Sequence, residues 1–308
     1  MKLQREELLD LLWGSAFFGC GGGGKFEEGL EMIDSLVGIE VADVEDIGEG
    51  IVASVYSCGS LKTEENPGWK EGKALLEMER LLGEKVVGIF ATELGPYNTF
   101  AAMKVAKDAG KKFLDADGAG RAVPEIHHSV PLMKGHPQHP MTAVSNGGDV
   151  FIIKELSDPE NAEKILRNLS ESLGNLGVCD HPMRASEAPE YLVLRSISKA
   201  MEVGKALREN DLREALSLAG GEVIEEGRIE DVSVEDDAGF TRGSFRIGRC
   251  TVVFKNENMK AICDGFEVEF PDLIIVLRSE DLLPISNPPL PEENVLLITA
   301  KASEEWYR

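Results

Sequence analysis

The first half of the chain alternates short apolar runs with longer segments in which apolar residues recur every three or four positions. Short runs that are apolar throughout favour strands buried on both faces, and the longer segments have the spacing of helices. This alternation of strand and helix predicts an α/β domain with a mainly parallel sheet. The expected strands are 39–44, 50–57, 85–93 and 112–117, and the expected helices are 68–83 and 97–111.

The pattern changes farther along the chain. Residues 141–155 have a hairpin signal at Asn146-Gly147-Gly148, and helices are expected at 158–174 and about 187–218. After Gly220, short alternating strands rich in β-branched residues indicate a β-rich unit. The predicted organisation is an α/β domain at 1–175, a helical connection at about 176–219 and a β-rich domain at about 220–308.

Charge and hydropathy narrow the classes of function. The 308 residues carry a formal net charge of −23, so the chain repels phosphate backbones and anionic membranes, and nucleic acid is not an expected partner. No stretch approaches the roughly 18 apolar residues of a membrane span. Glu6, Glu7 and Asp10 interrupt the region that would be apolar in a signal peptide. We therefore expect an amphipathic helix at the start of a cytoplasmic protein.

The stretch GCGGGGKF at 19–26 matches the beginning of a phosphate-binding loop. Phe26 stands where a magnesium-binding Ser or Thr is required, and the preceding segment is expected to be helical rather than a strand. No nucleotide is therefore expected. Gly21, Gly22, Gly23 and Gly24 leave their backbone N–H groups uncovered, so the run is either part of a ligand site or a tight packing corner.

Polar groups follow three of the predicted strands. Cys58, Glu93 and the pair Asp115 and Asp117 each lie at the end of an apolar run. The carboxyl ends of parallel strands meet at one edge of a sheet, where α/β proteins bind their ligands. We therefore expect these side chains to border one crevice.

The segment LDADGAGRAVPEIHH at 114–128 is unusually dense in ionisable groups. Two functions fit it: a chemical centre, or a structural network in which the charges pair with one another. Within it, Asp115 and Asp117 lie two apart, so in a strand they share a face and could bind a cation or raise one pKa. The ionisable residues are Asp115, Asp117, Arg121, Glu125, His127 and His128.

A metal is one candidate cofactor. Four of the five histidines lie at 127–139, and a divalent metal such as zinc could be held by Asp115, Asp117, His127 and His128. The alternative is a loop of hydrogen-bonded or exposed histidines. The five cysteines are odd in number and include no CxxC pair, which argues against a disulfide framework and against a four-cysteine zinc site.

Several motifs resemble one known family. They are GSAFFGCGGGG at 14–24, ATELGPYNT at 91–99, DADGAGRAVPE at 115–125, TRGSFRI at 241–247 and the β-rich run at 252–277. Over roughly 5–280 the chain resembles the S-methyl thiohydantoin desulfurase-like family, long catalogued as a domain of unknown function near hydantoinase-type genes. The resemblance implies an α/β domain followed by a β-rich domain, and a small-molecule hydrolase or desulfurase acting on a thiohydantoin- or hydantoin-like ring.

That reaction needs a base for water, a donor for the developing anion and an acid for the leaving group. The expected catalytic residues are Asp115, Asp117, Arg121, Glu125 and His127. Asp117, Glu125 or His127 is expected to transfer protons, and Arg121 or the N–H groups of the glycine run to stabilise the negative charge. The expected substrate-binding residues are Gly21, Gly22, Gly23, Gly24, Cys58, Glu93 and Asn98. The alternative function is a non-catalytic small-molecule-binding protein or the partner subunit of a hydantoinase-type enzyme. A small-molecule substrate and a homo-oligomer are the expected partners.

Overall fold

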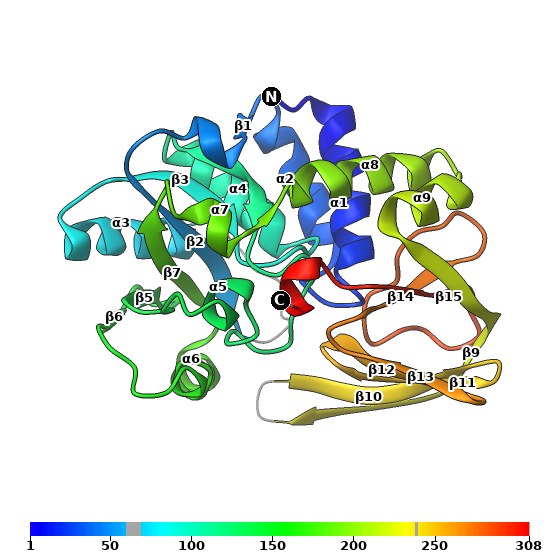
Figure 1. Cartoon of the computed structure of the whole chain (residues 1–308). Helices are drawn as coiled ribbons and strands as arrows, with labels where there is room; N and C mark the ends of the chain where they lie inside the picture. The colour runs from blue at the N-terminus through cyan, green and yellow to red at the C-terminus, as the bar shows by residue number, and fades with distance from the viewer. Residues whose placement is uncertain (60–68, 238–239, 308) are drawn as a thin grey trace.

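The apolar strands of the first half form one sheet in the computed structural model, which describes residues 1–59, 69–237 and 240–307 (Figure 1). Within these residues the strand order is β1-β4-β3-β2-β7-β5-β6, and β8 pairs with β4. The neighbours β1, β4, β3 and β2 are parallel, and the other pairs are antiparallel. The strands are β1 (Val41–Ala42), β2 (Ile51–Cys58), β3 (Val86–Ala91), β4 (Lys112–Asp117), β5 (Met141–Val144), β6 (Val150–Ile153), β7 (Leu176–Arg184) and β8 (Val193–Leu194).

Helices pack on both faces of this sheet, and the expected α/β fold class is confirmed. The expected helix at 68–83 is α3, apart from Gly68, which lies outside the described residues. Short helical turns also form at Val44–Asp46, directly after β1, and at Glu304–Tyr307, after the last strand. The α-helices are α1 (Arg5–Phe18), α2 (Phe26–Leu36), α3 (Trp69–Leu82), α4 (Asn98–Asp108), α5 (Val130–Met133), α6 (Glu160–Leu173), α7 (Ala188–Tyr191), α8 (Ser196–Arg208) and α9 (Leu212–Ala219). None of them is long and apolar enough to cross a membrane.

Residues 176–184 differ from the helical connection expected there. They form β7, which pairs antiparallel with both β2 and β5 inside the N-terminal sheet. Nearly every residue of β7 is buried, so it lacks the alternation that marks a strand with one solvated face. The rest of the segment holds α7, β8, α8 and α9.

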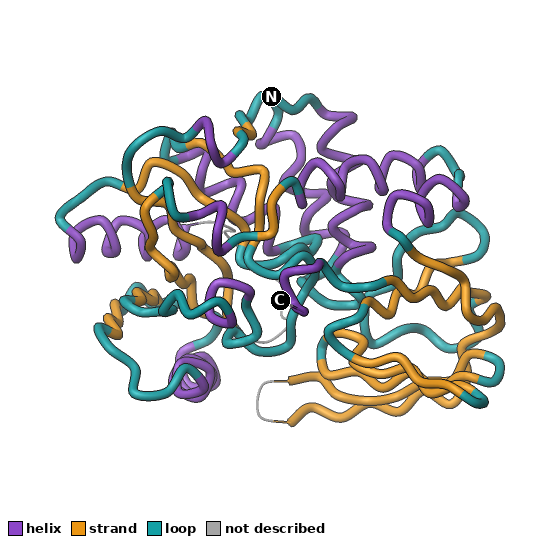
Figure 2. Tube along the Cα trace, in the orientation of Figure 1, coloured by secondary structure: helices purple, strands orange, loops and turns teal. Residues whose placement is uncertain are grey.

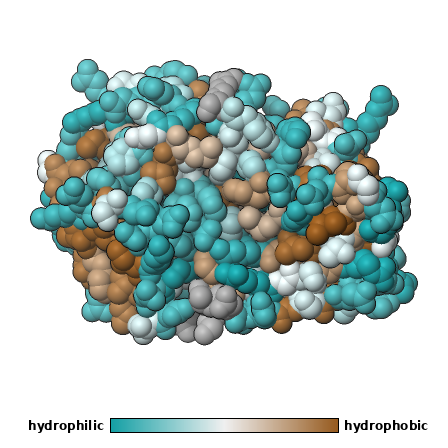
Figure 3. Space-filling view, turned by 60° about the horizontal axis from the view of Figure 1, so that its bottom comes forward, coloured by the Kyte–Doolittle hydropathy of each residue, from teal (hydrophilic) through white to brown (hydrophobic). Residues whose placement is uncertain are grey.

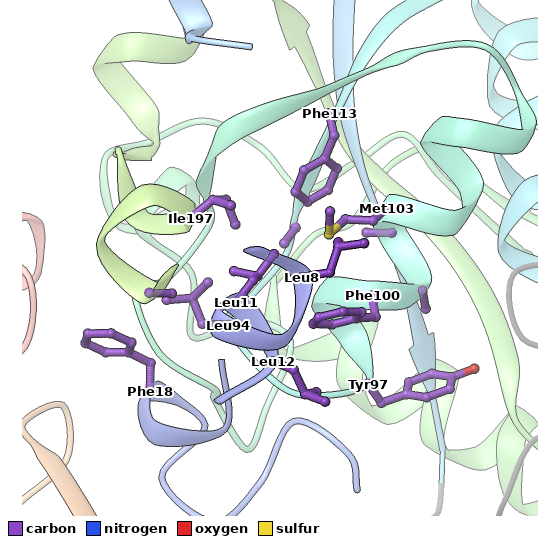
Figure 4. Packing of buried hydrophobic residues seen from close by; sticks show 14 of the residues in the cluster. Leu8, Leu11, Leu12, Phe18, Leu94, Tyr97, Phe100, Met103, Phe113 and Ile197 are labelled. Carbon is purple, nitrogen blue, oxygen red and sulfur yellow. The ribbon is translucent and has the colours of Figure 1, made fainter. Parts of the chain in front are cut away.

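Helix α1 lies in the middle of the main core, where Leu8, Leu11 and Leu12 point among side chains of α4 and α8 (Figure 4). The backbones of α1 and α8 touch. A Cβ atom on Gly14 would lie 1.7 Å from the carbonyl oxygen of Ala200, and one on Gly204 would lie 1.8 Å from that of Asp10. Only glycine permits this close approach.

The C-terminal domain is a curled antiparallel sheet, as the alternating pattern after Gly220 indicates. In the described residues its strand order is β13-β12-β11-β10-β9-β15-β14. The long strand β9 pairs with β15 through its first half and with β10 through its second. The strands are β9 (Gly221–Asp237), β10 (Phe240–Ile247), β11 (Cys250–Lys255), β12 (Glu257–Cys263), β13 (Phe266–Glu269), β14 (Leu273–Arg278) and β15 (Asn294–Ala300).

Strand β14 joins the cores of the two domains. Ile274 and Val276 face the core of the C-terminal sheet, whereas Leu273, Ile275 and Leu277 belong to the core that contains α1. Both faces of the strand are therefore buried, which explains its continuous apolar run. The face of the molecule shown in Figure 3 is largely hydrophilic, in keeping with the high charge of the chain.

One expectation about cysteines is corrected. Cys250 and Cys263 form a disulfide between β11 and β12, although the odd cysteine count argued against a disulfide framework. The two residues end neighbouring antiparallel strands, a pairing that sequence spacing does not reveal. Cys20, Cys58 and Cys179 are free and buried.

The glycine contact between α1 and α8 gives a stability prediction. Gly14→Ala should lower the free energy of unfolding by about 1–3 kcal/mol, because the new methyl group must push the two helices apart. Gly72→Ala in α3 is the matched control, since a Cβ there meets nothing within 4 Å. It should be neutral or stabilise by about 0.5–1 kcal/mol, which is the helix propensity gain. Urea unfolding of both variants tests this, and equal effects at the two positions would contradict it.

Candidate functional site

A pocket lies where the carboxyl ends of β2 and β3 meet the C-terminal domain. Loops from both domains gather there (Figure 2). The glycine run contributes Gly23 and Gly24, the strand ends contribute Cys58 and Glu93, and the segment after β4 contributes its residues at 123–124 and 126. Two of the three predicted strand ends, at Cys58 and Glu93, therefore border one pocket, whereas Asp115 and Asp117 at the end of β4 do not line it.

The glycine run is a packing corner that also borders the pocket. A Cβ on Gly22 would lie 2.0 Å from a carboxylate oxygen of Glu257, and a Cβ on Gly24 would lie 2.1 Å from the Cβ of Tyr97. The carbonyl oxygen of Gly23 accepts hydrogen bonds from the N–H groups of Tyr97 and Asn98, at the start of α4. The interpretation as a tight packing corner is therefore confirmed, Gly23 and Gly24 also line the pocket, and the segment before the run is helix α1, as expected.

Glu93 is the acid of the N-terminal domain in this pocket, and it is 5% exposed. Asn98 Nδ2 donates to its Oε1 at 2.6 Å, and the N–H of Val123 donates to its Oε2 at 2.7 Å. Burial raises the pKa of Glu93 to about 7, because desolvation outweighs these hydrogen bonds. The carboxyl group is fixed in place and titrates near neutral pH.

Glu257 is the acid that the C-terminal domain places in the same pocket, and sequence reasoning missed it. The N–H of Gly23 donates to its Oε1 at 3.3 Å, whereas its Oε2 is buried and has no hydrogen-bond partner among the described residues. Burial raises the pKa of Glu257 to about 8, and the nearby charge of Glu93 acts in the same direction. Its position in NEN at 256–258 carries no motif, so only tertiary packing identifies it.

Cys58 and Arg167 form another part of the pocket wall. Burial raises the pKa of the Cys58 thiol to about 11, so the thiol is neutral at physiological pH. Arg167 donates to Glu163 Oε1 at 2.6 Å and to the carbonyl oxygen of Gly59 at 2.9 Å, and its guanidinium lies 4.3 Å from the ring centre of Phe240. A cation from the N-terminal domain is thus held against the C-terminal domain at the pocket.

Asp115 and Asp117 are buried but do not line the pocket. Asp115 accepts hydrogen bonds from the N–H and the hydroxyl of Ser198, in the first turn of α8. Asp117 Oδ2 accepts from the N–H groups of Ala119 and Gly120, at 2.9 and 2.7 Å. Burial raises the pKa of Asp117 to about 7. The first aspartate caps a helix and the second closes a turn.

Arg121 also lies outside the pocket, fully buried between the domains. Its guanidinium donates to the carbonyl oxygens of Ala122, Pro271 and Asp272 at 2.7–2.9 Å and to that of Asn258 at 3.3 Å. It links the segment after β4 to the C-terminal sheet.

Glu125, His127 and His128 lie together at the edge of the pocket, next to Ile126, which lines it. Asp115 and Asp117 are not in this group, so the structure separates the four metal ligands that the sequence suggested. Glu125 forms a 2.8 Å ion pair with Lys255 of the C-terminal domain. Burial lowers the pKa of His128.

The fold and the site define a two-domain protein with a pocket that holds two buried acids, at the seam between an α/β domain and a curled β domain. Family models match almost all of the chain: "S-Me-THD-like, N-terminal domain" matches residues 6–155, and "S-Me-THD-like, C-terminal domain" matches residues 157–308. The chain belongs to this S-methyl thiohydantoin desulfurase-like family.

A solved structure shows the same fold. The crystal structure of a protein from Chromobacterium violaceum is similar to the whole chain, with a TM-score of 0.83 and 20% sequence identity, and 93% of that chain is covered. Comparison with curated proteins finds no match.

The two raised acids give a prediction for stability against pH. Both folded pKa values lie above the ordinary value of 4.5, so the folded state holds protons that the unfolded state releases. Their contribution to stability is therefore full below about pH 4.5 and is lost as the pH rises through 7–8. The free energy of unfolding should therefore fall between pH 5 and pH 8. The side chain introduced by Glu257→Gln does not titrate, so this variant should show a fall that is smaller by roughly 2–4 kcal/mol.

Urea unfolding at both pH values measures this effect. Glu79→Gln is the control, because Glu79 is also a buried glutamate but lies outside the pocket. Although burial opposes it, hydrogen bonds from Lys111 and Lys85 lower the pKa of Glu79. The control should leave the fall between pH 5 and pH 8 in place, and an unchanged fall in Glu257→Gln would contradict the prediction.

The turn after β4 gives a second prediction. Asp117→Ala leaves two buried N–H groups without their acceptor, so it should lower the free energy of unfolding by about 1–3 kcal/mol. Thermal unfolding measures the loss, and the folded variant should retain any activity of the pocket. A variant of unchanged stability that has lost activity would instead indicate that Asp117 has a catalytic role.

Proposed function

We propose that the pocket between the domains hydrolyses an S-methyl thiohydantoin-like ring and releases methanethiol. One observation carries the proposal: two buried carboxyl groups, Glu93 from one domain and Glu257 from the other, face the same pocket and titrate near neutral pH. Buried carboxyl groups whose pKa values are raised to near neutral pH are typical of acid–base catalysis. Membership of the family supports the choice of ring.

The reaction divides proton transfer between the two acids. Glu93, whose two oxygens accept hydrogen bonds that favour the ionised form, takes a proton from water as the water oxygen attacks the ring carbon that bears the S-methyl group. The electron pair of the carbon–nitrogen double bond moves to the ring nitrogen, and a tetrahedral intermediate forms. As this pair returns, the carbon–sulfur bond breaks and Glu257 gives its proton to the departing sulfur.

The products are methanethiol and a hydantoin, whose new carbonyl oxygen comes from water and whose ring nitrogen takes up the second proton of that water. The acid pair finishes with its proton on Glu93, and exchange through water returns that proton to Glu257. No oxidant or reductant is required, because the net reaction adds water and removes methanethiol.

Other residues of the pocket position these groups. Asn98 holds Glu93 by its 2.6 Å hydrogen bond, which keeps the base oriented. Arg167 supplies positive charge beside the intermediate, a role that the sequence suggested for Arg121. Cys58, as a neutral and polarisable thiol, provides a wall for the S-methyl group and not a nucleophile.

The proposal differs from the sequence-based assignment, which gave proton transfer to Asp117, Glu125 or His127. Asp117 accepts hydrogen bonds within the turn after β4, and Glu125 forms an ion pair with Lys255. A non-catalytic binding protein needs shape and donors, and it gains nothing from two buried acids of raised pKa. The acid pair therefore favours the enzyme over the binding protein and the partner subunit.

A thiol-trapping assay with an S-methyl thiohydantoin tests the proposal. Wild-type protein should release methanethiol with a narrow, bell-shaped dependence of kcat/KM on pH, with limbs near 7 and 8. Glu93→Gln should lower kcat at least about 100-fold, and Glu257→Gln should lower it and remove the alkaline limb. Glu79→Gln is the matched control and should retain activity.

Two results would overturn the proposal. One is turnover that both pocket variants retain. The other is an absence of turnover in wild type together with tight binding of the ring, since that outcome identifies a binding protein.

A further inference from the structure

The turn at the edge of the pocket contains a second cluster of side chains, which the proposed reaction does not use. We propose that Glu125, His127 and His128 bind a divalent transition-metal ion of the zinc type. The proposal does not depend on the proposed function, because neither Glu93 nor Glu257 belongs to the cluster.

The backbone holds the cluster in a defined shape. The N–H of His128 donates to the carbonyl oxygen of Glu125 at 2.9 Å, which closes a turn and brings the first and last side chains together. Glu163 accepts from the N–H of Ile126 at 2.8 Å, and Gln138 donates to the Ile126 carbonyl oxygen at 3.0 Å. The turn is thus fixed from two other segments before any ligand arrives.

The distances suit a single ion. One donor atom from each of the three residues lies within 4.8 Å of the others. Glu125 Oε2 lies 3.6 Å from His128 Nδ1. Two ligands at the usual zinc distance of about 2.1 Å are about 3.4 Å apart in a tetrahedral site. The Glu125–His128 pair therefore already has nearly the separation of two zinc ligands.

A ring nitrogen of each histidine is available to coordinate an ion. The Nδ1 atoms of His127 and His128 are buried, and neither has a hydrogen-bond partner among the described residues. A buried imidazole nitrogen without a partner costs free energy, which coordination to a metal would recover. The rings lie close together, with centres 4.4 Å apart, so both can turn a nitrogen to one point.

The surroundings leave one carboxylate oxygen for the ion. Lys255 binds Glu125 Oε1 at 2.8 Å, and the other oxygen faces His128. Phe270 packs against His128, with ring centres 5.1 Å apart, so the C-terminal domain supports both outer ligands. Two nitrogens and one oxygen leave a fourth position for water, as in open zinc sites.

Titration with zinc, and with cobalt as a spectroscopic probe, tests the site. Millimolar Mg²⁺ should be present, because it occupies the weak oxygen sites of an acidic surface and leaves nitrogen ligands free. Wild type should bind one Zn²⁺ per chain, and Co²⁺ should give the intense visible bands of low coordination number. Zinc should also shift the imidazole NMR signals of His127 and His128.

Glu125→Gln, His127→Ala and His128→Ala should each weaken zinc binding at least about tenfold. His139→Ala is the matched control, since it removes a nearby histidine from outside the turn and should bind zinc as wild type does. Circular dichroism confirms that each variant is folded, and the wild-type NMR shifts test the site without any variant. Zinc binding that the three substitutions leave unchanged, or wild-type imidazole signals that zinc does not move, would overturn the proposal.

Discussion

The close approach of backbone at Gly22, Gly23 and Gly24 is the constraint on which the pocket depends. A Cβ on any of the three would lie 2.0–2.5 Å from another atom: a Glu257 oxygen, the Cα of Gly95 or the Cβ of Tyr97. The first contact is with the C-terminal domain and the other two are with the loop and helix that follow β3. The run therefore sets how closely Glu257 approaches the strand ends of the other domain, and any larger side chain there would separate the acids.

Arg121 partly offsets the free-energy cost of burying two acids at the seam. A buried cation that donates to carbonyl oxygens of the C-terminal domain holds the domains together, and its charge lowers the pKa of both Glu93 and Glu257. Burial still prevails, so both pKa values remain above 4.5. The positive charge thus limits the free energy that ionising the acids costs.

The sequence predicts two pocket residues of the N-terminal domain and misplaces Asp115 and Asp117, which follow the same rule but do not line the pocket. Parallel strands bring their carboxyl ends to one edge, so Cys58 and Glu93 follow from the apolar runs before them. Glu257 could not be predicted in this way, because it begins an antiparallel strand of the other domain and reaches the pocket only through tertiary packing. The disulfide between Cys250 and Cys263 was hidden for the same reason, since strand register decides it.

The dense segment 114–128 shows why local composition is ambiguous. Its charged groups have separate roles, because the chain passes in turn under α8, through a tight turn, between the domains and along the edge of the pocket. Asp115 accepts a hydrogen bond from the first turn of α8, and Asp117 accepts one within the tight turn after β4. Arg121 donates to carbonyl groups of the C-terminal domain, and Glu125 lies beside His128. Sequence spacing detects that polar partners are present, but not on which side of the segment each partner lies.

The position of the acids between two domains couples protonation to closure of the seam. If the domains separated, water would reach Glu257 and its pKa would return toward 4.5, so protonation favours the closed arrangement. A neutral ring that filled the pocket would remove the remaining water from both acids and raise their pKa values further. Its binding would then take up a proton in the pH range where the pair titrates. In the reaction proposed above, the same desolvation that destabilises the ionised pair would keep Glu257 protonated until the departing sulfur takes its proton.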